Sequence, residues 1–174
     1  MEALGRLFDI QPVIMAVNLA TGANAGALVS LEHATGVTFV FLKDQGTAAE
    51  DPVLTFREAQ DGAATGEQDL DVVTTYYSKT NTDASALDGS ETWSKFTQAA
   101  GNIDGDNSAA EVGLSAEDEA LVAVYIGADQ LSDGFTHVTV DIADVGDAAQ
   151  IGAVIAILHG LVVQRAPENL PAAQ

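Results

Sequence analysis

Residues 37–61, VTFVFLKDQGTAAEDPVLTFREAQD, decide the expected fold. Residues 37–42 are apolar almost without interruption, which is typical of a central strand covered on both faces. Residues 53–59 alternate between two faces, as expected of a second strand. The connection between the two segments is polar and contains Gly46 and Pro52, which both break strands. This arrangement indicates an antiparallel β protein.

Several other segments have strand character because they are apolar, alternating, or rich in β-branched and aromatic residues. They are residues 13–19, 27–32, 70–79, 121–126 and 135–142. Residues 92–98 fit either a short strand or a helical turn. Residues 151–163 are favoured as a last strand, while periodicity alone leaves a buried helix open. We therefore predict an all-β fold, an antiparallel β-sandwich or barrel of about eight strands with long polar loops.

The chain of 174 residues fits one domain. We expect residues 1–12 to form an N-terminal arm, residues 13–164 a single β domain, and residues 165–174 a flexible C-terminal tail. In the arm, the interface candidates are Leu4, Leu7 and Phe8, which would contact a neighbouring subunit; the alternative is a frayed terminus. No secretory signal is visible. The run 151–163 is shorter than the ~20 residues that span a bilayer.

The charge is strongly unbalanced, with 26 acidic residues against 6 basic ones and a net charge of −20. Such a surface repels phosphate backbones and anionic membranes, so we expect neither nucleic acid nor membrane as a partner. The hydrophobic content of 47% is enough for a core. The chain has no cysteine, which excludes disulfides and thiolate metal sites.

No pattern of catalytic residues stands out. His33, His137 and His159 lie far apart and lack the spacing of a zinc site. The sequence has no GxSxG elbow and no phosphate-binding loop. The chain has so many carboxylates that two of them often stand next to each other by chance. Such neighbours therefore do not identify a general acid–base pair. We therefore expect no enzyme activity and no cofactor.

One acidic loop resembles the opening of a calcium-binding loop. Its oxygen-bearing residues are Asn102, Asp104 and Asp106, and Glu111 could complete a looser calcium site. It is not an EF-hand, because Asn107 stands where that loop requires Gly and Gly113 stands where it requires Glu. The alternative is an acidic loop shaped by Asn and Asp turns.

Three aromatic residues offer a different class of function. Trp93, the only tryptophan, is expected to pack in the core, and Tyr76 and Tyr77 should point to opposite faces of their strand. The alternative is a carbohydrate-binding β-sandwich module in which Trp93 or the tyrosine pair stacks on a sugar.

About half of the chain resembles a group of small virion structural proteins of tailed bacteriophages, usually encoded near the head genes. The matching features are turns and strand faces. They are Val17-Asn18-Leu19 before a Gly/Asn turn, residues 27–31, Phe39-Val40-Phe41, Gly46-Thr47-Ala48, Asp51-Pro52, Leu54-Thr55, Glu58-Ala59-Gln60-Asp61, and Ala143-Asp144-Val145-Gly146 before an apolar strand. The extreme acidity and the residues after Arg165 are not part of the pattern.

The resemblance implies a non-enzymatic capsid decoration or cement protein that binds the major capsid protein on the outer head surface and stabilises the shell. It would be a virion component on the capsid exterior, assembled in the host cytoplasm. It also implies a homo-oligomer, with trimers expected at local three-fold positions, and no catalytic or cofactor residues. A tail or head–tail connector component is the alternative.

Overall fold

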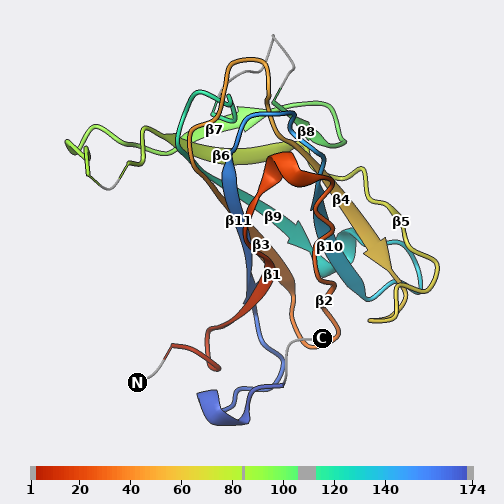
Figure 1. Cartoon of the computed structure of the whole chain (residues 1–174). Coiled ribbons are helices and arrows are strands. Elements are labelled where there is room, and N and C mark those ends of the chain that lie inside the picture. Colours follow the sequence, from red (N-terminus) through yellow and green to blue (C-terminus); the bar gives the residue numbers. More distant parts are fainter. Residues whose placement is uncertain (1–2, 84, 106–112, 172–174) are drawn as a thin grey trace.

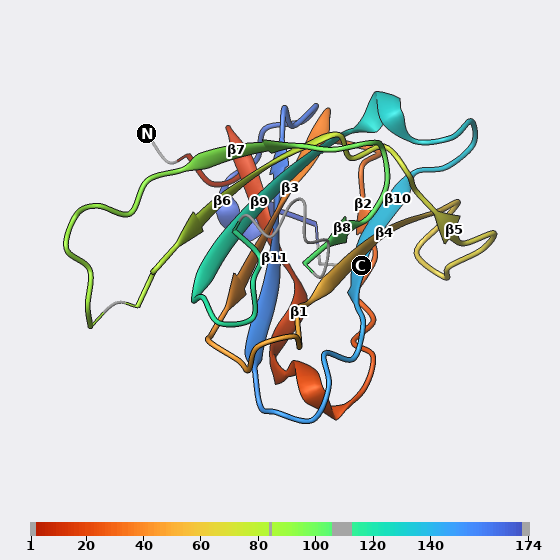
Figure 2. The same cartoon turned by 90° about the horizontal axis from the view of Figure 1, so that it is seen from above.

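Two antiparallel β-sheets pack face to face in the computed structural model, which describes residues 3–83, 85–105 and 113–171 (Figure 1). Seen from above, the sheets form two layers (Figure 2). The six-stranded sheet has the order β1-β11-β3-β9-β6-β7. The other sheet has five strands, in the order β2-β10-β4-β5 with β8 also paired to β4. The predicted all-β sandwich is confirmed.

The described strands agree broadly with the predicted segments. They are β1 (Phe8–Asn18), β2 (Val29–Ser30), β3 (Gly36–Lys43), β4 (Val53–Ala59), β5 (Gln68–Asp69), β6 (Thr75–Thr80), β7 (Ser94–Thr97), β8 (Ile103–Asp104), β9 (Ala120–Gly127), β10 (His137–Ile142) and β11 (Ile151–His159). The helices are single 3₁₀ turns, η1 (Leu19–Thr21), η2 (Ala128–Gln130) and η3 (Pro167–Asn169). No helix in the described ranges has the length and apolar character needed to cross a membrane.

The two strands that suggested the fold belong to different sheets. β3 lies between β11 and β9, whereas β4 lies between β10 and the short strands β5 and β8. They meet across the interior, where the ring centroids of Phe39 and Phe56 are 6.0 Å apart. The polar connection passes from one sheet to the other, and the Gly46 N–H donates to the Ala116 carbonyl at 2.7 Å.

The core consists of the inward-facing side chains of both sheets. Alternate residues along β3, β9 and β11 are buried, as the two-residue period of a strand requires. The fully buried apolar residues include Leu19, Val29, Val37, Phe56, Val122, Ile126, Val138, Val140, Ile142, Val154 and Ala156. This continuous apolar layer holds the sheets together.

β3 occupies a central place in its sheet, as predicted, but only one of its faces is covered. Phe39 and Phe41 point into the core, whereas Thr38, Val40 and Leu42 point outward, with Leu42 41% exposed. The expectation of a strand covered on both faces is therefore wrong for the single chain.

The described residues near both ends of the chain form more structure than an arm and a tail. β1 begins at Phe8, so residues 8–12 belong to the sheet and not to an arm. The Arg165 N–H donates to the Gly5 carbonyl at 2.8 Å, which ties the described part of the C-terminal segment to the N-terminal one. Gly5 has φ +77°, and a Cβ there would lie 2.5 Å from the Arg165 carbonyl oxygen.

Four other expectations are resolved. Residues 151–159 form a strand, and the ambiguous residues 92–98 contain strand β7. Tyr76 is buried and Tyr77 is exposed, so the two lie on opposite faces of β6, as predicted. The prediction that Trp93 packs in the core is wrong, because Trp93 is 49% exposed. The Lys79 ammonium lies 5.1 Å from the centroid of its ring.

Candidate interaction surface

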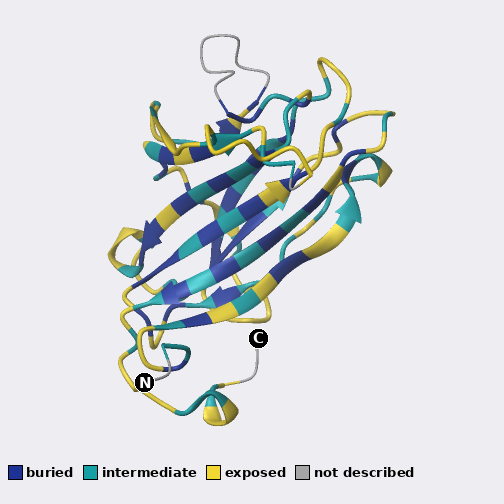
Figure 3. Ribbon diagram, turned by 90° about the vertical axis from the view of Figure 1, so that its left-hand side faces the viewer, coloured by how far each residue is buried: buried dark blue, intermediate teal, exposed yellow. Residues whose placement is uncertain are grey.

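The outer side of the six-stranded sheet carries a broad apolar surface, which we call the open face. It consists of the outward-pointing residues of five neighbouring strands, which alternate with buried positions along each strand (Figure 3). They are Ile10, Thr38, Val40, Leu42, Tyr77, Leu121, Ala123, Tyr125, Ile151, Ala153, Ile155 and Ile157.

The sheet register arranges these residues in rows across the strands. The central row is Ile155, Val40, Ala123 and Tyr77. On one side of it, Ile157, Thr38 and Tyr125 form a row, and on the other side Ala153, Leu42 and Leu121 form another. Residues opposite one another in antiparallel strands have Cβ atoms ~5 Å apart, so each row is a continuous surface, apolar apart from the hydroxyls of Thr38, Tyr77 and Tyr125.

Charge is distributed unevenly between the two outer sides of the sandwich. Among the described strand positions of the open face none is Asp or Glu, and Lys79 of β6 and Lys95 of the neighbouring strand β7 lie at its border. On the outer side of the other sheet, Arg57 lies 2.9 Å from Glu67, 3.3 Å from Asp69 and 3.6 Å from Asp141. One side is therefore polar and charged, and the other is apolar.

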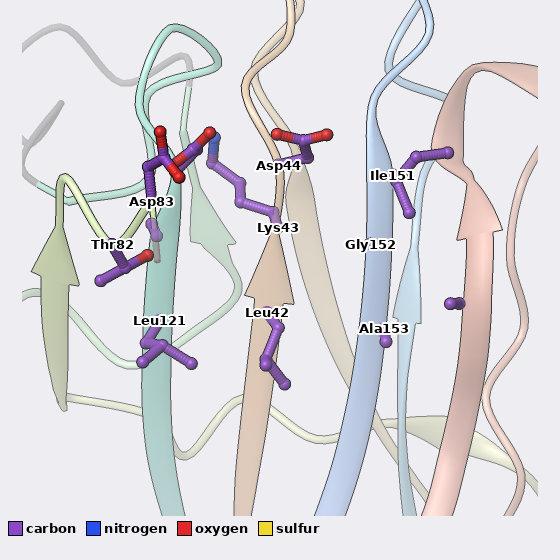
Figure 4. A pocket seen from close by; sticks show the side chains of 12 residues that line it. Leu42, Lys43, Asp44, Thr82, Asp83, Leu121, Ile151, Gly152 and Ala153 are labelled. Carbon is purple, nitrogen blue, oxygen red and sulfur yellow. The ribbon is translucent and has the colours of Figure 1, made fainter. Parts of the chain in front are cut away.

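An open hollow of about 510 Å³ lies at one end of the open face (Figure 4). Leu42, Leu121 and Ala153 belong to its lining, and Asp44 and Asp83 lie at its polar end. Glu119 also lines the hollow. Partial desolvation raises the pKa of the Glu119 carboxyl, and the negative charges of Asp83 and Asp44 raise it further. The hollow thus combines an apolar floor with hydrogen-bond acceptors at one end.

Lys43 fixes the segment beside this hollow. Its ammonium donates to the carbonyls of Ala116, at 3.3 Å, and of Asp118. Burial lowers the pKa of Lys43 from 10.5 to about 8, although the charges of Asp118 and Asp51 oppose that change. Because its hydrogen bonds go to backbone carbonyls, we assign Lys43 the role of holding residues 116–118 against β3.

The interface candidates of the N-terminal segment lie near the open face. Phe8 pairs with His159 at the start of β1 and has the same orientation as Ile10, while Leu7 is 67% exposed. Leu4 forms a bridge to Phe8. The predicted contact residues are thus continuous with one end of the apolar surface, and Leu4 is partly covered.

The proposed calcium ligands are only partly visible. Asn102 and Asp104 are exposed at β8, whereas Asp106 and Glu111 lie outside the described residues. The Asn102 carbonyl accepts a hydrogen bond from Gln98. In the part of the chain that the structure describes, no group of three or more His, Asp or Glu side chains could hold a metal ion.

The three histidines have separate surroundings. His33 is exposed in a turn, His137 is buried beside Thr136, and His159 lies 2.8 Å from the Thr38 hydroxyl. His137 and His159 belong to different sheets. The structure therefore does not bring them together.

Comparison of the chain with protein-family models, with curated proteins and with solved structures finds no match. The fold and the open face together define a β-sandwich with one charged side and one apolar side. The open face was missed at the level of sequence, although its signal is present. Residues 37–42, 121–126 and 151–158 are apolar on both faces, and they form three adjacent strands.

Proposed function

We propose that this chain is a non-enzymatic virion structural protein that acts by contact with other proteins, most specifically a decoration or cement protein on the outer surface of a phage capsid. The observation that carries the proposal is the open face. Monomeric proteins rarely expose large continuous apolar surfaces, and such surfaces mark sites of protein contact. The resemblance to small phage head proteins supplies the biological setting.

The charge of the molecule suits a position on the outside of a shell. Its net charge of −20 disfavours contact with packaged DNA. Many copies on one particle would give the particle a strongly negative surface, which keeps particles apart. A protein that bridges neighbouring shell subunits binds the assembled shell preferentially and so stabilises it. We take the major capsid protein as the partner.

A carbohydrate-binding module is less well supported. Trp93 is exposed, but the Lys79 ammonium lies over its ring and occupies a surface on which a sugar would stack. Tyr77 belongs to the open face, where it lies between Ala123 and Lys95 of the neighbouring strands, and Tyr76 is buried. A tail or head–tail connector component fits the same apolar face and is separated from a decoration protein by copy number.

The test is to locate and count the protein in purified virions of the phage that encodes it. We expect quantitative mass spectrometry to find it at a number comparable to the major capsid protein, and antibody labelling to mark intact heads. Particles that lack it should assemble but lose their contents at lower temperature. A stoichiometry of six or twelve would indicate a connector, and absence from virions would contradict the proposal.

A further inference from the structure

We propose that a second copy of this chain covers the open face, so that two copies pair face to face about a two-fold axis that runs across the strands. In this pair, Tyr125 of each copy occupies the hollow at the end of the other copy's open face. The inference rests on the proposed function only in that both assign the open face to protein contact, and a pair formed through this face would contact a capsid protein through its other surfaces.

The first reason is the composition of the central strands. Strands that are apolar on both faces are typical of sheets that are covered on both sides. In β3, β9 and β11 the inner face is covered by the other sheet, and the outer face is open in the single chain. An assembled partner would supply the cover that this sequence pattern predicts.

The second reason is charge. A basic partner would be attracted to the acidic parts of the molecule, where most of the 26 carboxylates lie. The open face instead lacks carboxylates at its described strand positions. A negatively charged partner can pack well only on a face without negative charges, because like charges that face each other are destabilising. Another copy has that same charge.

The third reason is area. Five strands spaced by about 4.8 Å, each presenting about 26 Å of its length, give a footprint of roughly 600 Å² per copy. A pair would therefore bury roughly 1,200 Å² in total, above the roughly 1,000 Å² expected of a specific interface.

The orientation of the pair follows from the acidic end of the face. Asp44 and Glu119 come directly beyond the ends of β3 and β9. A two-fold axis parallel to the strands would bring these carboxylates of both copies together. An axis across the strands, through the row of Val40 and Ala123, instead places them over the opposite end of the second copy. That end contains Gly36 and Gly127.

The same axis matches Tyr125 to the hollow. Tyr125 is 54% exposed, and its hydroxyl lies across Gly36, where a Cβ on Gly36 would clash with it. Gly36 and Asp44 lie four residues either side of Val40 on β3. The axis through Val40 therefore places the Tyr125 hydroxyl of one copy over Asp44 of the other.

The rest of this contact is apolar. Tyr125 of the second copy lies over Leu121, one row from Val40, and its ring covers the hollow floor formed by Leu42 and Ala153. The Tyr125 hydroxyl can donate a hydrogen bond to the Asp44 carboxylate. Two packed sheets cross at about −30°, and this twist leaves the positions nearest the axis aligned.

The test is the mass of the purified protein by light scattering and sedimentation equilibrium up to about 100 μM, a range suited to an interface of this size. We expect a dimer of the 17.9 kDa chain. Leu42→Glu and Tyr125→Ala should weaken dimerisation roughly ten-fold or more, and Tyr125→Phe should weaken it less, because it keeps the ring.

Val162→Glu is the matched control for Leu42→Glu, because Val162 is 70% exposed and lies beyond β11, outside the open face. It should leave the dimer intact. Thermal melting monitored by circular dichroism verifies that each variant folds. A wild-type monomer at all concentrations, a trimer, or a dimer that Leu42→Glu and Tyr125→Ala do not weaken would overturn the inference. The virion experiment above is independent of this result.

Discussion

At the scale of single residues, Lys43 shows how burial changes a charged side chain. Among the described residues it is the one buried Lys or Arg, and its ammonium is held by the carbonyls of Ala116 and Asp118. The carboxylates around it are insufficient to offset desolvation, which lowers its pKa to about 8. The folded chain therefore loses this proton at a lower pH than the unfolded chain.

This shift predicts a pH dependence of stability with a definite sign. Between pH 8 and 10.5 the unfolded state binds more protons at Lys43 than the folded state, so its contribution to stability rises with pH. Below pH 8 the cost of burying the ammonium is fully present. Urea unfolding should show that the stability difference, wild type minus Lys43→Met, grows across this window.

The comparison with Lys43→Met isolates one group. Tyr76, whose pKa burial raises, titrates in both proteins and cancels from the difference. A difference that stays constant or falls between pH 8 and 10.5 would show that Lys43 is not desolvated in the folded protein.

At the scale of elements, the contact between β3 and β4 links the two sheets. Phe56 is fully buried and packs on Phe39 from the opposite sheet. Phe56→Ala should lower the free energy of unfolding by about 3–5 kcal/mol, because it removes a large side chain and leaves a cavity between the sheets.

Thr55→Ala is the control for Phe56→Ala, because Thr55 is the next residue of β4 and points to the outer side of the five-stranded sheet. It should change stability by about 1 kcal/mol or less. Equal losses in urea unfolding for the two variants would contradict the face-to-face packing of β3 and β4.

The strands themselves could be predicted from the sequence, because β-branched and apolar runs with a period of two identify them locally. Their partners could not. Strands β3 and β4 follow each other in the chain, yet the connection between them places β4 in the other sheet. Local composition does not distinguish a hairpin from such a crossing. Trp93 was misplaced for a related reason, because a large aromatic residue beside a short edge strand need not reach the core.

The open face could not be predicted either. A strand that is apolar on both faces has the same sequence pattern whether its outer face packs on its own chain or on another protein. Only the arrangement of β11, β3 and β9 as neighbours shows that three such sides form one surface. The excess of acidic residues is visible in the sequence. That Asp and Glu side chains are absent from the described strand positions of the open face depends on the strand register, which the sequence does not show.

At the scale of the whole molecule, the net charge of −20 opposes the association of two copies. Added salt should therefore strengthen the proposed dimer. Raising the ionic strength from about 0.01 M to about 1 M shortens the Debye length from about 30 Å to about 3 Å, which screens repulsion between the copies. Sedimentation equilibrium in a sodium chloride series should show a falling dissociation constant. A dimer that dissociates as salt rises would instead indicate that ion pairs dominate the contact.

The outer strands of the six-stranded sheet limit how far such an assembly can grow. β1 contains Pro12, which has no N–H to offer, and its register to β11 shifts on either side of Ile14. β7, at the opposite border, covers only Ser94–Thr97. Neither border is a good template for another chain, and the far side of the sandwich presents Arg57 among carboxylates. Edge-to-edge growth of the six-stranded sheet into filaments is thus disfavoured, so an assembly built through the open face would stay closed.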